Sequence, residues 1–171
     1  MKIKSNSIVN GYFTDNIGHR GTHFLKDIMP NYSFHLAWED LPLNTKSLAL
    51  VFVDHDAIPV CGFTWVHWLT ANIDPTLNEL PENASETMDL LEGVNSWNSG
   101  IIPKEYQLNK EDASRYGGCA PPDKEHLYTV ELYALDTQLT LSPGFTMNEL
   151  LKAMKGHVLD EATLEALYKT K

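Results

Sequence analysis

Ionisable side chains stand where apolar, strand-like stretches of the sequence begin or end. Asp54 follows six consecutive apolar residues, and Asp56 comes two residues later. His67 lies inside an aromatic stretch, while His126 and Tyr128 are two residues apart at the head of another strand-like stretch, so we expect that pair to share one face. Carboxylates and imidazoles form charge-assisted hydrogen bonds and exchange protons near neutral pH. These residue types therefore suit anion binding, metal binding or acid–base chemistry.

Taken singly, several of these residues also have a purely structural interpretation. Asp54 and Asp56 flank a turn that Pro59 restricts, and aspartates commonly cap such turns through local backbone N–H groups. A histidine in an aromatic strand, such as His67, is often a core residue with satisfied hydrogen bonds. The residues become informative only in combination.

The segment 116–122, YGGCAPP, adds a possible ligand contact through the backbone. Gly117 and Gly118 permit unusual backbone angles and the close approach of a ligand to main-chain N–H groups. Cys119 lies beside them and a few residues before His126, which raises the alternative of a Cys–His hydrolase. Such an enzyme needs an oriented base and an oxyanion hole, and the sequence assigns no third residue to it.

Strand-like patterns dominate the first three-quarters of the chain. Phe34, Leu36 and Trp38 alternate with other residues, which places His35 on the opposite, solvent-facing side. The continuous apolar run 47–53 predicts a strand covered on both faces. Further strands are predicted at 64–73 and 128–135, the latter with Val130, Leu132 and Ala134 on one side and Thr129, Glu131 and Tyr133 on the other. His19 and His23 fall in a polar segment and are expected to be exposed.

Helical patterns are concentrated near the C-terminus. Thr146 and Glu149 have the spacing of a capping box, and the helix they begin should end at Gly156. A second short helix is predicted over residues 160–168. The long segment 74–116, rich in Asn, Pro, Gly and Ser, should carry short strands or turns, or shape a site. The sequence thus predicts a mainly β domain, residues 1–171, with C-terminal helices packed on it.

Composition and charge narrow the function classes. The chain has 171 residues, of which 43 % are hydrophobic and 21 % charged, as expected of one globular domain. Its net charge of −10 repels phosphate backbones and argues against nucleic acid as a general partner. No stretch resembles a signal peptide or a spanning helix, so we expect a cytoplasmic protein without stable membrane insertion. Two cysteines with no CxxC pair argue against a disulfide framework and a structural zinc site, and each is expected to be a small buried residue.

In combination these motifs resemble the phosphatidylethanolamine-binding protein family, and within it the bacterial Raf kinase inhibitor-like branch. The resemblance spans about residues 31 to 159. It is carried by Trp38, Leu41-Pro42, Ser47-Leu48-Ala49-Leu50, Asp54, Asp56-Ala57, His67-Trp68, Asn72-Ile73, Asn95-Ser96-Trp97, Gly118, Pro121-Pro122, His126, Tyr128 and Lys155-Gly156-His157-Val158-Leu159.

The resemblance implies a large antiparallel sheet packed on a smaller one, with flanking helices, and a small anion-binding cavity near one end of the large sheet. The positions that would line this cavity are Asp54, Trp65, His67, Gly118, Pro122, His126 and Tyr128. It implies a phosphate-like or other small anionic ligand, no cofactor and no catalysis. Pairing as a homodimer and a modulatory role, through a phosphorylated group on a protein partner, are also implied by resemblance alone.

The sequence departs from the family pattern at the rim of the expected cavity. The usual first motif, D-P-D-A-P, has His55 in place of the first proline, and Ile58 displaces the second proline to Pro59. The loop from Pro122 to His126 is short, and Leu127 stands where eukaryotic members often have arginine. These differences affect the choice of ligand.

For such a cavity we expect Asp54 to accept a hydrogen bond from one imidazole and to favour its charged form. His67 and His126, with the Tyr128 hydroxyl and the Gly118 N–H, would then donate to the anion. Two alternatives remain at this point. One is a two-histidine, one-carboxylate metal centre built from Asp54, His67 and His126. The other is an inhibitor of a kinase or protease that acts through its surface.

Overall fold

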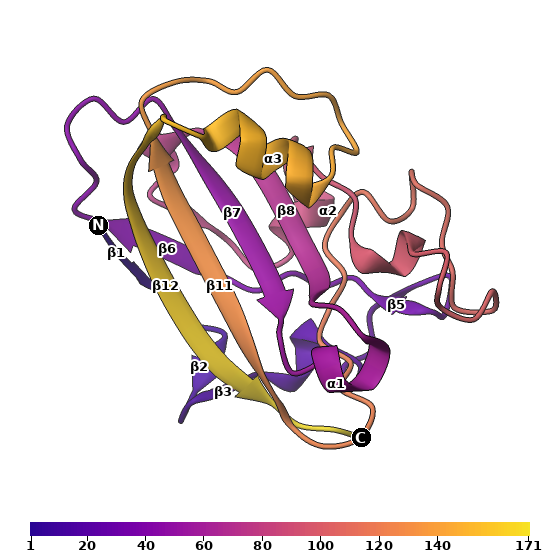
Figure 1. Cartoon of the computed structure of the whole chain (residues 1–171). Coiled ribbons are helices and arrows are strands. Elements are labelled where there is room, and N and C mark those ends of the chain that lie inside the picture. Colours follow the sequence, from indigo (N-terminus) through magenta and orange to yellow (C-terminus); the bar gives the residue numbers. More distant parts are fainter.

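A curved seven-stranded sheet organises the molecule, in the order β10-β8-β7-β11-β12-β3-β2 (Figure 1). A computed structural model of the chain describes every residue from Met1 to Lys171. All neighbouring strands are antiparallel except β12 and β3, which are parallel. The strands are β2 (Ile8–Val9), β3 (Tyr12–Phe13), β7 (Ser47–Asp54), β8 (Trp65–Ile73), β10 (Leu91–Glu92), β11 (His126–Leu135) and β12 (Val158–Tyr168).

Smaller elements surround this sheet. A three-stranded sheet contains β1 (Lys2–Lys4), β6 (Leu36–Glu39) and β9 (Glu79–Leu80), and a hairpin contains β4 (Phe24–Leu25) and β5 (Met29–Pro30). The helices are α1 (Ile58–Cys61), α2 (Ala84–Thr87) and α3 (Met147–Met154), with 3-10 turns η1 (Asp15–Ile17), η2 (Pro75–Leu77) and η3 (Ser96–Asn98). None of these helices has the length and apolar character needed to span a bilayer.

The two faces of the large sheet bury two separate cores. Leu48, Leu50 and Phe52 of β7 join the larger core, which also contains Phe34 and Leu36 near the small sheet. The alternate residues of β7, Ala49, Val51 and Val53, join a second core that α3 covers with Leu150 and Met154. Every residue of β7 is buried, as the continuous apolar run predicted. The mainly β fold, with a large sheet packed on a smaller one, is therefore confirmed.

The helix near the C-terminus begins as its sequence predicted. The Thr146 hydroxyl accepts the Glu149 N–H, and the Glu149 carboxylate accepts the Thr146 N–H at 2.7 Å. Together these bonds satisfy two N–H groups that the first turn leaves free. The helix ends at Met154, and Gly156 follows with a positive φ of 84°.

The predicted second helix over residues 160–168 is wrong, because these residues belong to strand β12. Its apolar positions recur every second residue, and Ala166 and Tyr168 are buried in the larger core. β12 pairs with β11 from His126↔Tyr168 to Leu135↔Val158, and thereby covers an edge of the long strand that a helix would have left unpaired. Pairing with a distant strand therefore decides the conformation of this short amphipathic segment.

Two further expectations concern the middle of the chain and a histidine. The segment 74–116 carries the short elements η2, β9, α2, β10 and η3, as expected of a long segment inside one domain. His35, expected to face solvent, is only 7 % exposed. Its Nδ1 accepts the Asn6 N–H at 3.0 Å and its Nε2 lies 3.3 Å from a Glu79 carboxylate oxygen, so the N-terminal segment and β9 enclose it.

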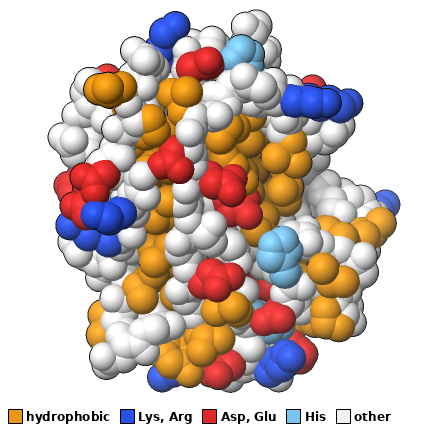
Figure 2. All heavy atoms as spheres, turned by 60° about the vertical axis from the view of Figure 1, so that its left-hand side comes forward, with side chains coloured by type: hydrophobic (Ala, Val, Ile, Leu, Met, Phe, Trp, Pro, Cys, Tyr) orange, Lys and Arg blue, Asp and Glu red, His pale blue; other side chains and the backbone are white.

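The acidic character of the chain is visible on its surface. Figure 2 shows the side of the molecule on which β12 lies, where Asp and Glu side chains are interspersed with hydrophobic ones, and Lys and Arg appear mainly toward the margins. Glu161 and Glu165 on β12 and Glu131 on β11 contribute to the negative charge of these strands, and neither strand contains Lys or Arg. No positively charged surface suited to a nucleic acid backbone lies on this side.

Candidate functional site

The ends of three neighbouring strands surround a cavity of about 590 Å³. β7 ends at Asp54, β8 begins at Trp65 and β11 begins at His126. Because these strands are antiparallel neighbours, their register places Asp54 opposite both Trp65 and Tyr128. Six of the seven predicted site residues line this one cavity: Asp54, Trp65, His67, Pro122, His126 and Tyr128.

A buried ion pair between Asp54 and His126 forms the polar centre of the cavity. The Asp54 Oδ2 lies 2.7 Å from His126 Nδ1, and the two side chains are 5 % and 1 % exposed. The Asp54 Oδ1 accepts the Ala57 N–H at 3.1 Å, which fixes the carboxylate at the turn after β7. Burial opposes the charged imidazole, but hydrogen bonds to Asp54 and Asp123 outweigh it and raise the pKa of His126. The two carboxylates therefore favour the charged form of His126.

His67 has a different protonation state from the one expected. Its side chain is buried, and its Nδ1 lies 2.7 Å from the carbonyl oxygen of Gly117. Burial lowers the pKa of His67 to about 4, so the ring is neutral at pH 7 and its single N–H is at Nδ1, donating to that carbonyl. The expectation that His67 presents an N–H donor to the ligand is wrong, because its Nε2 carries a lone pair instead.

Three polar atoms of cavity residues have no protein partner: His19 Nε2 and two donors. The hydroxyl of Tyr128 and the indole N–H of Trp65 are both buried without a hydrogen bond. Burial raises the pKa of Tyr128 far above its usual range, so the phenol keeps its proton. An indole N–H can only donate. Because unpaired buried polar groups are costly, a hydrogen-bond acceptor that reaches either group would stabilise the protein.

Gly118 is the one predicted site residue that the structure does not place on the cavity wall. Its N–H donates to the Pro30 carbonyl oxygen at 2.7 Å and is not free for a ligand. A Cβ at this position would lie 2.3 Å from the Ile17 carbonyl oxygen and 2.8 Å from Pro30 Cβ. Glycine is required here for close packing of three segments, which corrects the expectation of a fourth donor.

Comparison with known proteins matches residues 5–169 to the model of the phosphatidylethanolamine-binding protein family. The chain belongs to this family. It is 47 % identical over 140 residues to the Bacillus subtilis protein YxkA, covering 81 % of this chain and 82 % of that protein. It is 40 % identical over 141 residues to a UPF0098 protein of Methanothermobacter thermautotrophicus, covering 81 % and 83 %.

Solved structures of family members agree with the fold. The crystal structure of a phosphatidylethanolamine-binding protein homologue from Chlamydia trachomatis has a TM-score of 0.79 at 26 % identity, over 99 % of this chain and 97 % of that one. Escherichia coli YbcL has a TM-score of 0.75 at 23 % identity, over 99 % and 98 %. The resemblance read from the sequence motifs is thus confirmed at the level of family and fold.

Several cavity residues of this phosphatidylethanolamine-binding family member were missed by sequence reasoning. His19, expected to be exposed, lines the cavity, and burial lowers its pKa to about 4. The His19 N–H donates to the Cys119 carbonyl oxygen at 2.8 Å, and this bond holds His19 at the cavity. Because the two residues are a hundred positions apart, no local pattern reveals the contact. Asp123 is not on the cavity wall but bonds His126 three residues later, and that spacing on a short turn was the one available signal. Trp97 and Tyr106 complete an aromatic wall.

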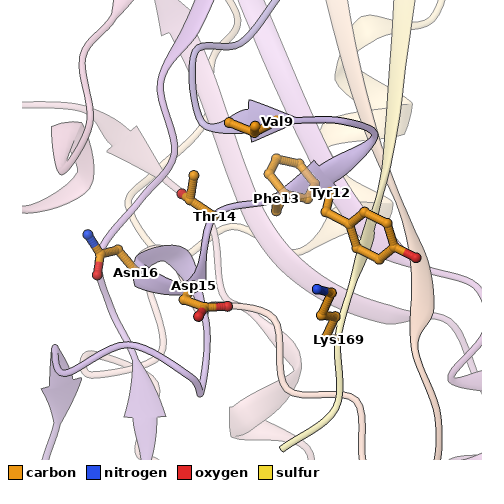
Figure 3. A pocket seen from close by; sticks show the side chains of 7 residues that line it. All are labelled: Val9, Tyr12, Phe13, Thr14, Asp15, Asn16 and Lys169. Atoms are coloured by element: carbon orange, nitrogen blue, oxygen red, sulfur yellow. The ribbon is translucent and has the colours of Figure 1, made fainter.

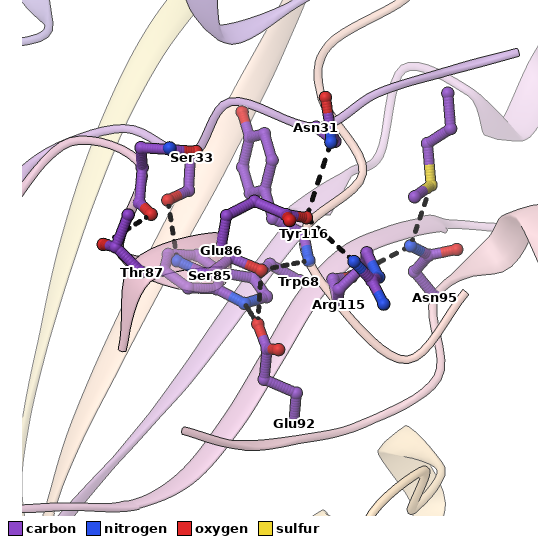
Figure 4. A network of polar contacts seen from close by, with 12 residues as sticks. Asn31, Ser33, Trp68, Ser85, Glu86, Thr87, Glu92, Asn95, Arg115 and Tyr116 are labelled. Atoms are coloured by element: carbon purple, nitrogen blue, oxygen red, sulfur yellow. Dashed lines mark hydrogen bonds and ion pairs between the residues drawn. The ribbon is translucent and has the colours of Figure 1, made fainter. Parts of the chain in front are cut away.

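A polar network joins Trp68, Ser85, Glu92 and Tyr116 (Figure 4). The Ser85 hydroxyl accepts the Tyr116 N–H at 3.0 Å and donates to Glu92 Oε1 at 2.6 Å. The Trp68 indole N–H donates to the same Glu92 oxygen at 2.6 Å. Burial raises the pKa of Glu92 to about 7. The network anchors the chain one residue before Gly117, whose carbonyl accepts from His67.

The catalytic and metal-binding alternatives have little geometric support. Cys119 is fully buried in the larger core, and burial raises the pKa of its thiol, so it is neither ionised nor within reach of the cavity. Cys61 is half-buried on the cavity wall and has no disulfide partner. No group of three or more His, Cys, Asp and Glu side chains is arranged to hold a metal ion.

A second hollow, of about 360 Å³, lies beside β2 and β3 (Figure 3). It is lined by Val9, Tyr12, Phe13, Thr14, Asp15, Asn16 and Lys169. Its charged groups already have partners, because Asp15 pairs with Arg20 at 2.8 Å and the Lys169 ammonium lies 5.1 Å from the centre of the Tyr12 ring. It lacks the buried ion pair of the larger cavity, which is the candidate site.

Proposed function

We propose that the protein binds a small oxyanion, or a phosphorylated group, in the cavity at the ends of β7, β8 and β11, and that it acts as a modulator without catalysing a reaction. The observation that carries this proposal is the pair of unpartnered donors, the Tyr128 hydroxyl and the Trp65 indole N–H, of residues that line the same cavity as the charged imidazole of His126. Donors grouped around a cation favour a ligand that offers acceptors and negative charge.

The charge balance of the cavity is compatible with such a ligand. The ion pair of Asp54 and His126 is internally neutral, and neutral His67 adds no charge. Asp123 on His126 Nε2 adds one negative charge, and Lys171 on the cavity wall adds one positive charge. Charge-assisted hydrogen bonds contribute roughly 1.5–3 kcal/mol each. A few of them, set against the cost of ordering the ligand, give micromolar to millimolar affinity for a bare anion.

Sulfate titration by calorimetry tests the proposal, because sulfate keeps its charge across the pH range in which imidazole titrates. Tyr128→Phe removes one donor and should weaken sulfate binding about tenfold, which corresponds to about 1.4 kcal/mol. Tyr133→Phe, which removes a phenol that bonds Glu131 outside the cavity, is the matched control and should bind as the wild type does. Equal affinity in all three proteins, or no binding at tens of millimolar sulfate, would refute the proposal.

The pH dependence gives an independent check. Since its carboxylate partners raise the pKa of His126, the imidazolium persists to a higher pH than that of an unperturbed histidine. Sulfate affinity should therefore stay constant through pH 6 and fall as the pH rises through that raised pKa. A sulfate affinity that is flat from pH 6 to pH 9 would remove His126 from the binding step.

A further inference from the structure

Both ring nitrogens of His126 are bonded to carboxylates, and the two carboxylates differ in their surroundings. Asp54 holds Nδ1 from the end of β7 and is 5 % exposed. Asp123 holds Nε2 through its Oδ1 at 2.8 Å, from the turn before β11, and its side chain is 52 % exposed. The inner carboxylate, Asp54, is buried at the end of a sheet strand, whereas the outer carboxylate, Asp123, lies on an exposed turn.

The Asp123 carboxylate accepts the hydrogen bond from His126 Nε2–H, the donor that a ligand would need. Because Asp54 uses Nδ1, the Nε2–H of the imidazolium is its only remaining donor. A carboxylate is itself an oxyanion, so Asp123 makes the contact that a bound anion would make. We propose that Asp123 is an internal competitor, which must leave Nε2 before a free oxyanion binds there. The turn Pro121–Glu125 then controls access to His126. This inference rests on the proposed function.

The surrounding contacts allow Asp123 to leave without disturbing the rest of the site. The Leu127 N–H donates to the Asp56 carboxylate at 2.9 Å, and this bond fixes the start of β11. His126 stays held by Asp54. The Asp123 carboxylate bonds His126 and otherwise only the backbone N–H groups of its own turn, at Asp123 and Lys124, so its movement breaks a single contact with another element.

The net charge around His126 depends on whether Asp123 is bonded to it. With Asp123 in place, the two aspartates and the imidazolium sum to one negative charge, which repels a second anion. With Asp123 turned out to solvent, the centre is neutral and Nε2–H is free. A tethered carboxylate competes at high effective concentration, so a weak monoanion such as acetate should fail where a dianion with several acceptors succeeds.

Two charged residues that line the cavity, Asp27 and Lys171, make no bond to His126, and Asp27 serves as the control. Asp27 carries the same charge as Asp123 but does not bond His126, so Asp27→Asn removes one negative charge without freeing the donor. This comparison separates a direct competitor from a general effect of charge.

The experiment measures sulfate and acetate binding by calorimetry in the wild type, Asp123→Asn, Asp123→Ala and Asp27→Asn, with thermal unfolding to confirm folding. We expect sulfate to bind about tenfold more tightly to both Asp123 variants and less than twofold more tightly to Asp27→Asn. We expect acetate to bind Asp123→Ala, where it replaces the missing carboxylate, and not the wild type. In the wild type, the carboxyl carbon resonance of Asp123 should shift on addition of sulfate.

Each outcome has a separate meaning. Unchanged sulfate affinity in both Asp123 variants overturns the competitor and leaves the proposed function standing. An equal gain in Asp27→Asn overturns it in favour of a general charge effect. Absence of sulfate binding in the wild type and in every variant overturns the proposed function as well.

Discussion

Replacing Glu92 by glutamine should stabilise the protein at alkaline pH and leave it nearly unchanged at acidic pH. Glu92 Oε1 accepts from Ser85 Oγ and from Trp68 Nε1, both at 2.6 Å. Glutamine offers an equivalent oxygen, so both hydrogen bonds survive the change. What the substitution removes is the negative charge that burial penalises.

The magnitude follows from linkage. Burial raises the pKa of Glu92 from 4.5 to about 7. Between these values the folded chain keeps a proton that the unfolded chain has released, so the stability falls as the pH rises. Above pH 7 both states are ionised and the loss is complete, at about 2–3 kcal/mol. Below pH 4.5 both states are protonated and there is no loss.

Urea unfolding of the wild type and Glu92→Gln at pH 5 and pH 8 measures the effect. The gain in unfolding free energy should be about 2–3 kcal/mol at pH 8 and below about 1 kcal/mol at pH 5. In a thermal scan at pH 8 this corresponds to roughly 5–10 °C for a chain of this length. Glu105→Gln, at an exposed position, is the matched control and should show no such pH dependence.

Two outcomes would contradict this reasoning. A gain of the same size at both pH values would show that the charge of Glu92 is not the cause. A loss of stability at pH 8 would show that the ionised carboxylate strengthens the bonds to Ser85 and Trp68 by more than its burial costs.

Two further predictions concern stability. Gly118→Ala places a Cβ 2.3 Å from the Ile17 carbonyl oxygen and should lower the unfolding free energy, measured by urea titration, by more than about 2 kcal/mol. Gly100→Ala is the control, because a Cβ there meets nothing within 4 Å, and it should cost less than about 0.5 kcal/mol. Thr146→Ala removes the hydroxyl of the capping box and should cost about 1 kcal/mol, whereas Thr146→Ser should retain most of that stability; equal losses in both variants would contradict the capping role.

The sequence predicted those features that depend on local pattern. The apolar run of β7 and the alternation of β11 each fix which face is buried, and the structure follows both. The capping box at Thr146 depends only on Glu149, three residues later, and formed as expected. The strand β12 was mistaken for a helix, because a short segment of alternating Ala, Leu and Glu suits either period until a partner strand is available.

For the candidate site, too, some features were predictable from the sequence and others were not. Family resemblance brought Asp54, His67, His126 and Tyr128 to one cavity, but it could not assign their protonation. Protonation depends on burial and on the partner of each nitrogen, and these differ between the two histidines. Gly118 was misjudged because its close contacts with Ile17 and Pro30 come from distant segments.

The register that closes the core also builds the site. His126 and Tyr128 lie on the face of β11 that carries Val130 and Leu132 into the larger core, and Asp54 stands opposite Tyr128 on β7. A slip of one residue between these strands would turn the polar and apolar members to the other face together. The pairing of Asp54 with His126 is therefore as firmly specified as the core itself. The turn that carries Asp123 contributes no strand pairing to this register. On the proposed function, it is therefore the part of the site whose sequence can change, and with it the selectivity for anions, while the fold stays the same.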